Sequence, residues 1–270
     1  MNNVFYIMGA LSWSPGFFCS FQSVVGFLKF VEEQKPIGFK VFFEKGLYLD
    51  STIGPNWWEY YFEPINIGKA KEDTEINHIG DMLKSQWSSE AISIIPREEA
   101  SSLIQKHIKV KQLVQNKINV IKQKFENKNV IGIHYRGTDK SSEARRVSYN
   151  DVSNYIKTIF NSDDKIFVAT DEQMFITHMV SVFGDSVIYT NAIRSNDNGK
   201  PIHHTDGRPM KFAYQLGEDA VIDCYLLANC NMLVKTFSNL SSSAANINPN
   251  IPIVNLNEHH ASYSKHYKLR

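Results

Sequence analysis

Residues 134–140 hold several side chains that can do chemistry, and they directly follow an apolar run at 130–133. An apolar run that ends in a glycine-containing polar turn is typical of a buried strand reaching the ligand-binding edge of an α/β sheet. The segment offers two cations, a carboxylate, an imidazole and a hydroxyl, which suits a phosphate-bearing ligand and a proton transfer. A solvated charged turn is the alternative, because short motifs often arise by chance. The residues are His134, Tyr135, Arg136, Gly137, Thr138, Asp139 and Lys140.

Two more apolar runs end in polar residues. Residues 166–169 lead into Thr170, Asp171 and Glu172, and residues 232–235 lead into a hydroxyl-rich stretch at 236–243. The second stretch is expected to open a helix, whose N-terminal N–H groups and partial positive charge can bind phosphate. Helix capping, by Thr170 or Asp171 in the first case, explains both stretches without a ligand. The chain has neither a P-loop motif nor a GxGxxG fingerprint.

Asp223 lies among apolar residues of an expected helix over 217–228. A half-buried carboxylate usually has a partner. A ligand amine or amide N–H and an internal arginine are both suitable partners, and the sequence does not separate them.

Strands and helices alternate along the chain, most regularly in its second half. Regular alternation of this kind predicts parallel, doubly wound sheets. A long helical region is expected at 97–127, and the polar residues that end it indicate a domain boundary. We therefore expect two α/β domains, residues 1–128 and 129–270, with a cleft between them. The expected strands lie at 4–8, 39–43, 130–133, 165–169, 186–189, 232–235 and 251–254.

An aromatic stretch at 56–64 includes Trp57, Trp58 and Tyr60 beside two glutamates. Such rings can stack on a sugar acceptor while the carboxylates bind its hydroxyls. The alternative is a loop that packs its rings into the core, because large aromatic side chains bury readily.

The composition is that of an ordinary soluble globular protein, with 43% hydrophobic and 21% charged residues. The net charge of +1 provides no overall field that would attract nucleic acid or an anionic membrane. The three cysteines show no paired or CxxC spacing, which favours free thiols, with Cys224 and Cys230 in the core. No Asp-x-Asp pair occurs, so no metal site is expected. The sequence shows no signal-peptide pattern and no run of ~20 apolar residues that would span a membrane.

Taken in order, these pieces resemble the fucosyltransferases that use GDP-fucose, namely the α-1,6-fucosyltransferases and the bacterial nodulation fucosyltransferase. The family pattern is HxRRTDK, a strand that ends in ATDD, a helix with a buried aspartate, and TFSS at a helix start. Here the same order reads HYRGTDK at 134–140, ATDE at 169–172, Asp223, and TFSN at 236–239. The likeness covers roughly residues 130–250.

The resemblance implies an α/β fold of two facing Rossmann-like domains, of the GT-B glycosyltransferase type. It implies that the C-terminal domain holds the nucleotide and that the N-terminal domain is on the acceptor side. His134 and Asp223 would bind guanine, Arg136 the pyrophosphate, and Ser238 and Asn239 the phosphates. The full expected donor-binding set is His134, Arg136, Asp171, Glu172, Asp223, Thr236, Ser238 and Asn239.

The implied reaction is the inverting, metal-independent transfer of fucose from GDP-fucose to a glycan hydroxyl. Arg136 would neutralise the charge that grows on departing GDP, the role that a metal has in other transferases. Glu143 is the first choice for the base and Asp139 the second, while Lys140 could orient the base or touch phosphate. No cofactor is expected beside the donor, and the acceptor would be an oligosaccharide or glycolipid. A cytoplasmic role in surface polysaccharide synthesis follows, with peripheral membrane association left open.

The chain departs from the family pattern at three positions, Gly137, Glu172 and Asn239. These changes leave the nucleotide better defined than the sugar, so GDP-mannose or a GDP-heptose is an alternative donor. A protein that binds a GDP-sugar without transferring it is another alternative, because Gly137 stands where a second arginine is expected.

Overall fold

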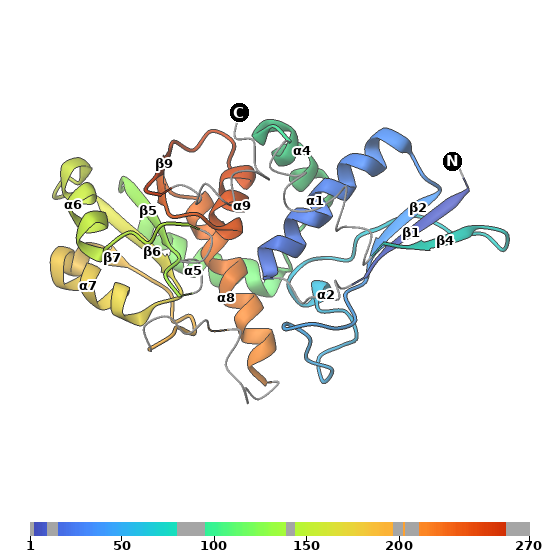
Figure 1. The fold of residues 1–270 in the computed structure, drawn as a ribbon, viewed down its shortest axis with the longest axis horizontal. Coiled ribbons are helices and arrows are strands. Elements are labelled where there is room, and N and C mark those ends of the chain that lie inside the picture. The colour runs from blue at the N-terminus through green and yellow to red at the C-terminus, as the bar shows by residue number, and fades with distance from the viewer. Residues whose placement is uncertain are drawn as a thin grey trace. The chain divides into compact units, whose positions relative to one another are not determined.

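The computed structural model describes residues 3–9, 16–79, 95–138, 144–196, 202 and 211–257. The chain divides into two compact units (Figure 1). The first comprises Met1–Gln115 and Pro209–Glu218, and the second comprises Asn116–Arg208 and Asp219–Arg270. Among the described residues, no helix is both long enough and apolar enough to cross a membrane.

The first unit is built on a mixed four-stranded sheet with the order β3-β2-β1-β4. Strand β1 pairs in parallel with β2 and β4, whereas β3 runs antiparallel to β2. Helix α1 (Phe17–Gln34) connects β1 to β2, and its apolar side chains are buried along most of its length. The expected alternation of strands and helices is therefore confirmed at the start of the chain, where β1 and β2 overlap the strands expected at 4–8 and 39–43. The strands are β1 (Val4–Met8), β2 (Gly38–Val41), β3 (Asn66–Gly68) and β4 (Glu75–His78).

The helical region expected over 97–127 is present but interrupted. The structure has α4 (Arg97–His107), α5 (Gln112–Lys122) and a short 3-10 turn, η2 (Gln123–Phe125). Residues 108–111 are not helical because their backbone pairs with residues 61–63. The Glu63 N–H donates to the Lys109 carbonyl at 2.8 Å, and the Lys111 N–H donates to the Tyr61 carbonyl at 2.9 Å. Helical periodicity cannot reveal this break, because it depends on a distant segment.

The aromatic stretch at 56–64 forms core rather than a sugar-binding surface. The stretch forms the short helix α2 (Trp58–Tyr61), with Trp57 as its N-cap. The exposed fractions of Trp57, Trp58 and Tyr60 are only 3%, 0% and 7%. The rings pack on one another, with Trp57 stacked on Phe43 at 4.6 Å between centroids. The expectation that an acceptor stacks on these three rings is therefore wrong.

The second unit contains a five-stranded sheet in which every pairing is parallel, with the order β7-β6-β5-β8-β9. The predicted doubly wound parallel sheet is confirmed for this unit. The chain order reverses between β5 and β8, and ligands of such sheets bind outside the carboxyl ends of the strands at this switch point. The strands are β5 (Val130–Tyr135), β6 (Lys165–Thr170), β7 (Val187–Ile188), β8 (Met232–Lys235) and β9 (Ile253–Asn255).

Apolar helices cover both faces of this sheet. Side chains of α6 (Tyr149–Ile159) and α7 (Gln173–Phe183) pack with Ile131, Ile133 and Tyr135 of β5. On the opposite face, a Cβ at Gly132 would lie 2.8 Å from the sulfur of Cys230 and 3.3 Å from Leu227, so glycine permits α8 (Lys211–Ala228) to approach β5 closely. The three cysteines are free and buried, which confirms the core placement of Cys224 and Cys230.

Candidate functional site

Arg136 links the ends of the three central strands of the second unit. It directly follows β5, and its backbone N–H donates to the Thr236 hydroxyl beyond β8 at 2.8 Å. Its Nε lies 3.1 Å from Oδ2 of Asp171, which directly follows β6. The arginine side chain is 21% exposed, while that of Asp171 is only 5% exposed. The buried carboxylate of Asp171 thus holds a partly exposed arginine side chain at the switch point.

Asp171 also organises the turn that follows Arg136. Its Oδ1 accepts the Gly137 N–H at 3.1 Å, and its Oδ2 accepts the Thr138 hydroxyl. The capping explanation for Thr170 and Asp171 is wrong, because the residue before α7 is Glu172 and makes no side-chain cap. The Gln173 N–H instead donates to the backbone carbonyl of Ser195 at 3.0 Å. Asp171 is therefore a structural acceptor for the 136–138 turn.

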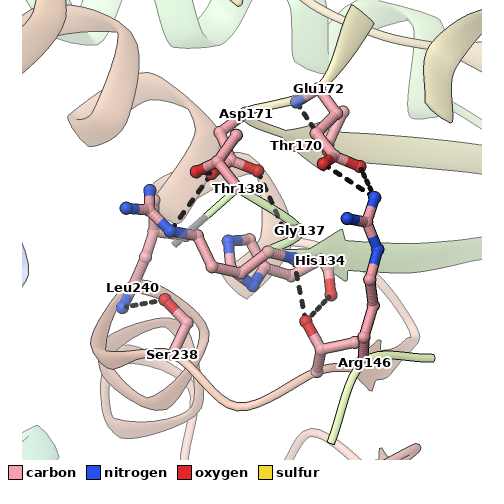
Figure 2. A network of polar contacts seen from close by, with 11 residues as sticks. His134, Gly137, Thr138, Arg146, Thr170, Asp171, Glu172, Ser238 and Leu240 are labelled. Atoms are coloured by element: carbon pink, nitrogen blue, oxygen red, sulfur yellow. Dashed lines mark hydrogen bonds and ion pairs between the residues drawn. The ribbon is translucent and has the colours of Figure 1, made fainter. Parts of the chain in front are cut away.

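Glu172 is buried above Gly137. Its carboxylate accepts from Nη2 of Arg146 at 3.0 and 3.2 Å and from the Tyr149 hydroxyl at 2.6 Å. A Cβ at residue 137 would lie only 2.3 Å from Oε2 of this carboxylate. Two of the three departures from the family pattern, Gly137 and Glu172, are thus in contact with each other (Figure 2).

His134 lies inside the second unit, with only 4% of its surface exposed. Burial lowers its pKa to about 3, aided by the positive charges of Arg136 and Lys235, so the imidazole is neutral near pH 7. Lys235 is the register partner of His134 across β5 and β8. Nδ1 of His134 is buried without a hydrogen-bond partner among the described residues. An unsatisfied buried ring nitrogen is costly unless a ligand supplies the partner.

Asp223 has protein partners. Its Oδ1 accepts the Thr190 hydroxyl at 2.8 Å, and Arg194 is the nearby cation that favours the charged form. Arg194 in turn donates through Nη2 to the Thr190 carbonyl at 2.8 Å. Burial dominates and raises the pKa of Asp223 to about 7. An internal arginine, Arg194, is therefore near Asp223, as one of the two alternatives for its partner required. A carboxylate with a pKa near 7 is also one mark of a functional site.

The hydroxyl-rich stretch after β8 opens a helix, as expected. Ser238 is the N-cap of α9 (Asn239–Ile247), and its hydroxyl accepts the Leu240 N–H at 3.3 Å. Asn239 is the first residue of that helix, and Thr236 accepts the N–H of Arg136. Capping thus accounts for the Ser238 hydroxyl, and contacts of Ser238 and Asn239 with phosphate stay predictions.

Three expected catalytic residues, Asp139, Lys140 and Glu143, lie outside the described residues. In the part of the chain that the structure describes, no three or more His, Cys, Asp or Glu side chains gather as a metal site would require. Several residues that contact the expected ones were not predicted from the sequence. Lys235 carried the same signal as the other clusters, a polar residue at the end of an apolar strand, while the others are close only in space. The missed residues are Arg146, Tyr149, Thr190, Arg194 and Lys235.

No protein-family model matches the chain, and no curated protein matches it in sequence. Solved structures do match it. The NodZ α-1,6-fucosyltransferase co-crystallised with GDP is 16% identical with a TM-score of 0.61, covering 94% of this chain and 95% of that one. The fold is that of the NodZ fucosyltransferase.

NodZ from Bradyrhizobium in its selenomethionine form gives a TM-score of 0.64 at 15% identity, with the same coverage. POFUT1 in complex with GDP gives 0.51 at 10% identity, covering 94% of this chain and 98% of that one. The expected Rossmann-like α/β class and the structural likeness to fucosyltransferases are confirmed.

Proposed function

We propose that this protein is an inverting, metal-independent glycosyltransferase that moves fucose from GDP-fucose to a glycan hydroxyl. The observation that carries the proposal is the Arg136 guanidinium, held by the buried Asp171 at the switch point of a parallel sheet. A planar guanidinium binds phosphate oxygens bidentately, and open α/β sheets bind ligands at this position. Similar folds with GDP, or soaked with GDP-fucose, support the choice of donor.

Guanine would be bound by His134 and Asp223. A neutral imidazole offers one donor and one acceptor, and a carboxylate accepts the N–H groups on the edge of guanine. The unsatisfied Nδ1 of His134 and the pKa of about 7 at Asp223 both suit a polar ligand partner. Arg194 and Thr190 already satisfy part of Asp223, so the base would share this carboxylate with them.

The pyrophosphate would lie at Arg136 and at the start of α9, close to Thr236, Ser238 and Asn239. Asp171 and Glu172 would position the residues that bind the donor. In the reaction the acceptor oxygen attacks the anomeric carbon, and the bond from that carbon to the β-phosphate oxygen breaks. GDP leaves with the electron pair, and positive groups aimed at it stabilise the charge. Glu143, or else Asp139, takes the acceptor proton, and Lys140 orients the base.

Residues 129–270 would act as the donor domain and residues 1–128 as the acceptor domain. The acceptor would be an oligosaccharide or glycolipid of a cell-surface polysaccharide, glycosylated in the cytoplasm. A GDP-sugar other than GDP-fucose, and a binding role without transfer, are outcomes that the following experiment separates.

The test is GDP release from GDP-fucose by the purified chain, together with calorimetric binding of GDP. Turnover that is lost in Arg136→Ala and only partly kept in Arg136→Lys supports the proposal, because lysine retains the charge but not the planar fork. Arg145→Ala is the matched control, since Arg145 is an exposed arginine in the same unit.

A panel of GDP-mannose, GDP-heptose and GDP-fucose identifies the donor. GDP binding without turnover of any donor, with candidate glycan acceptors present, would favour the binding protein. Failure of the unsubstituted chain to bind any guanine nucleotide contradicts the proposal.

A further inference from the structure

Glu172 occupies the space that a side chain at residue 137 would need. A Cβ at that position would lie 2.3 Å from Oε2, 2.4 Å from Cδ and 2.6 Å from Oε1 of Glu172. The end of a flexible side chain can often move aside, but this one is only 3% exposed. Two donors hold it, Nη2 of Arg146 at 3.0 Å and the Tyr149 hydroxyl at 2.6 Å. A larger residue at 137 would therefore break a buried charged network.

The same carboxylate brings Arg146 next to Gly137. Oε1 of Glu172 would lie 2.6 Å from a Cβ at residue 137 and is 3.0 Å from Nη2 of Arg146, so this nitrogen is within about 6 Å of that Cβ position. An arginine side chain spans such a distance. The side chain of Arg146 is 42% exposed, although its Nη2 is bound to the buried carboxylate of Glu172 (Figure 2).

Arg136 and Arg146 are held by consecutive carboxylates at one strand end. Asp171 binds Arg136 and Glu172 binds Arg146, and both acids directly follow β6. Each pair joins a carboxylate side chain at least 95% buried to an arginine side chain that is partly exposed. Two guanidinium groups held by residues that directly follow β6 suit a ligand with two adjacent phosphates, because each planar fork can bind one group.

From this geometry we infer that Arg146 is a second pyrophosphate-binding residue, which Glu172 positions beside Gly137 in place of a cation at residue 137. The inference rests on the proposed function for the identity of the ligand. The contact between Gly137 and Glu172 stands independently of any ligand.

The ligand arm compares GDP with GMP, because only GDP carries the second phosphate. We expect Arg146→Ala to weaken GDP binding roughly tenfold or more, as the loss of a charged hydrogen bond does, and to change GMP binding much less. Arg145→Ala, which removes the neighbouring exposed arginine, should change neither ligand. Equal effects of Arg146→Ala and Arg145→Ala on the GDP-to-GMP ratio overturn the role of Arg146.

A conservative variant distinguishes a loss of binding from a folding defect. Arg146→Lys can still pair with Glu172, so it should fold, but it lacks the bidentate fork and should lower the same ratio by a smaller factor. Unfolding curves of each variant show whether a loss of affinity arises from a loss of structure. A folded Arg146→Lys and a folded Arg146→Ala that both keep the original ratio contradict the inference.

The steric arm uses thermal unfolding without ligand. Gly137→Ala should lower the Tm of the unsubstituted chain, and it should lower it much less in a Glu172→Ala background, where the clash is removed. Additive effects of the two substitutions would disprove the contact. If the two substitutions are coupled but no guanine nucleotide binds, the proposed function fails while the positioning role of Glu172 remains.

Discussion

The hydroxyl of Thr236 accepts a 2.8 Å hydrogen bond from the backbone N–H of Arg136, and this bond joins the ends of β5 and β8. The two residues are 100 positions apart in the chain. Thr236 is 2% exposed, so no water can easily replace its hydroxyl. This contact fixes the point at which Arg136 leaves the sheet.

Thr236→Val should destabilise the chain by about 1–3 kcal/mol, because valine keeps the shape of threonine but leaves the N–H of Arg136 buried without an acceptor. Thr236→Ser keeps the hydroxyl and should cost less. Urea unfolding of the three proteins measures the difference. Equal losses in the valine and serine variants would show that the hydrogen bond does not matter.

Asp171→Asn should weaken GDP binding roughly tenfold and destabilise the chain by about 2–3 kcal/mol, since it leaves Arg136 without its buried counter-charge. The amide keeps the size of the carboxylate, so the change tests charge rather than packing. Asp163→Asn is a matched control, because Asp163 is an exposed aspartate of the same unit. Calorimetry with GDP and thermal unfolding give both values, and a variant that matches the control would exclude this role for Asp171.

Guanosine binding should tighten as the pH rises toward 7. Burial raises the pKa of Asp223 to about 7, so below that pH the free protein carries a neutral carboxyl, which accepts the guanine N–H groups less well. Affinity should increase up to about tenfold per pH unit between pH 5 and 7 and then level off. Guanosine is the suitable probe because it carries no phosphate that titrates in this range.

Asp223→Asn should bind guanosine weakly and without this pH dependence. Equal pH profiles for the two proteins would show that Asp223 does not contact guanine. For stability the sign is opposite: the folded carboxyl holds its proton up to about pH 7, so its contribution to stability is lost as the pH rises from about 4 through 7.

His134 should make the chain sensitive to acid. Its pKa falls from 6.5 to about 3 on folding, chiefly through burial. Between these values the unfolded chain binds a proton that the folded chain does not, so the contribution of His134 to stability falls by about 1.4 kcal/mol per pH unit as the pH drops, opposite in sign to that of Asp223. Between pH 6 and 4, the unfolding free energy of His134→Gln, measured by urea unfolding at each pH, should therefore gain on that of the unsubstituted chain as the pH drops. A slope identical to that of the unsubstituted chain would show that His134 titrates normally.

Local sequence predicted the elements that depend on local pattern. The runs at 130–133, 166–169 and 232–234 predict buried parallel strands because they contain no polar side chain, and they lie in β5, β6 and β8. The break after His107 could not be predicted, since it follows from backbone pairing with residues 61–63. Core packing of Trp57 and Trp58 was one of two alternatives, and only the structure decided between them, because an aromatic side chain suits a core and a sugar surface alike.

The sequence by itself determined which side chains stand near the ends of the central strands, because Arg136, Asp171 and Thr236 each follow an apolar run by no more than three residues. Only the tertiary structure decided their partners, since strand order and register bring together residues that are far apart in the chain. The tertiary structure also explains Gly137. In the sequence alone this glycine merely stands where the family motif has a second arginine, whereas in the fold its lack of a side chain leaves room for Glu172, which binds Arg146. A sequence gives the type of each side chain, but its neighbours depend on packing among distant segments.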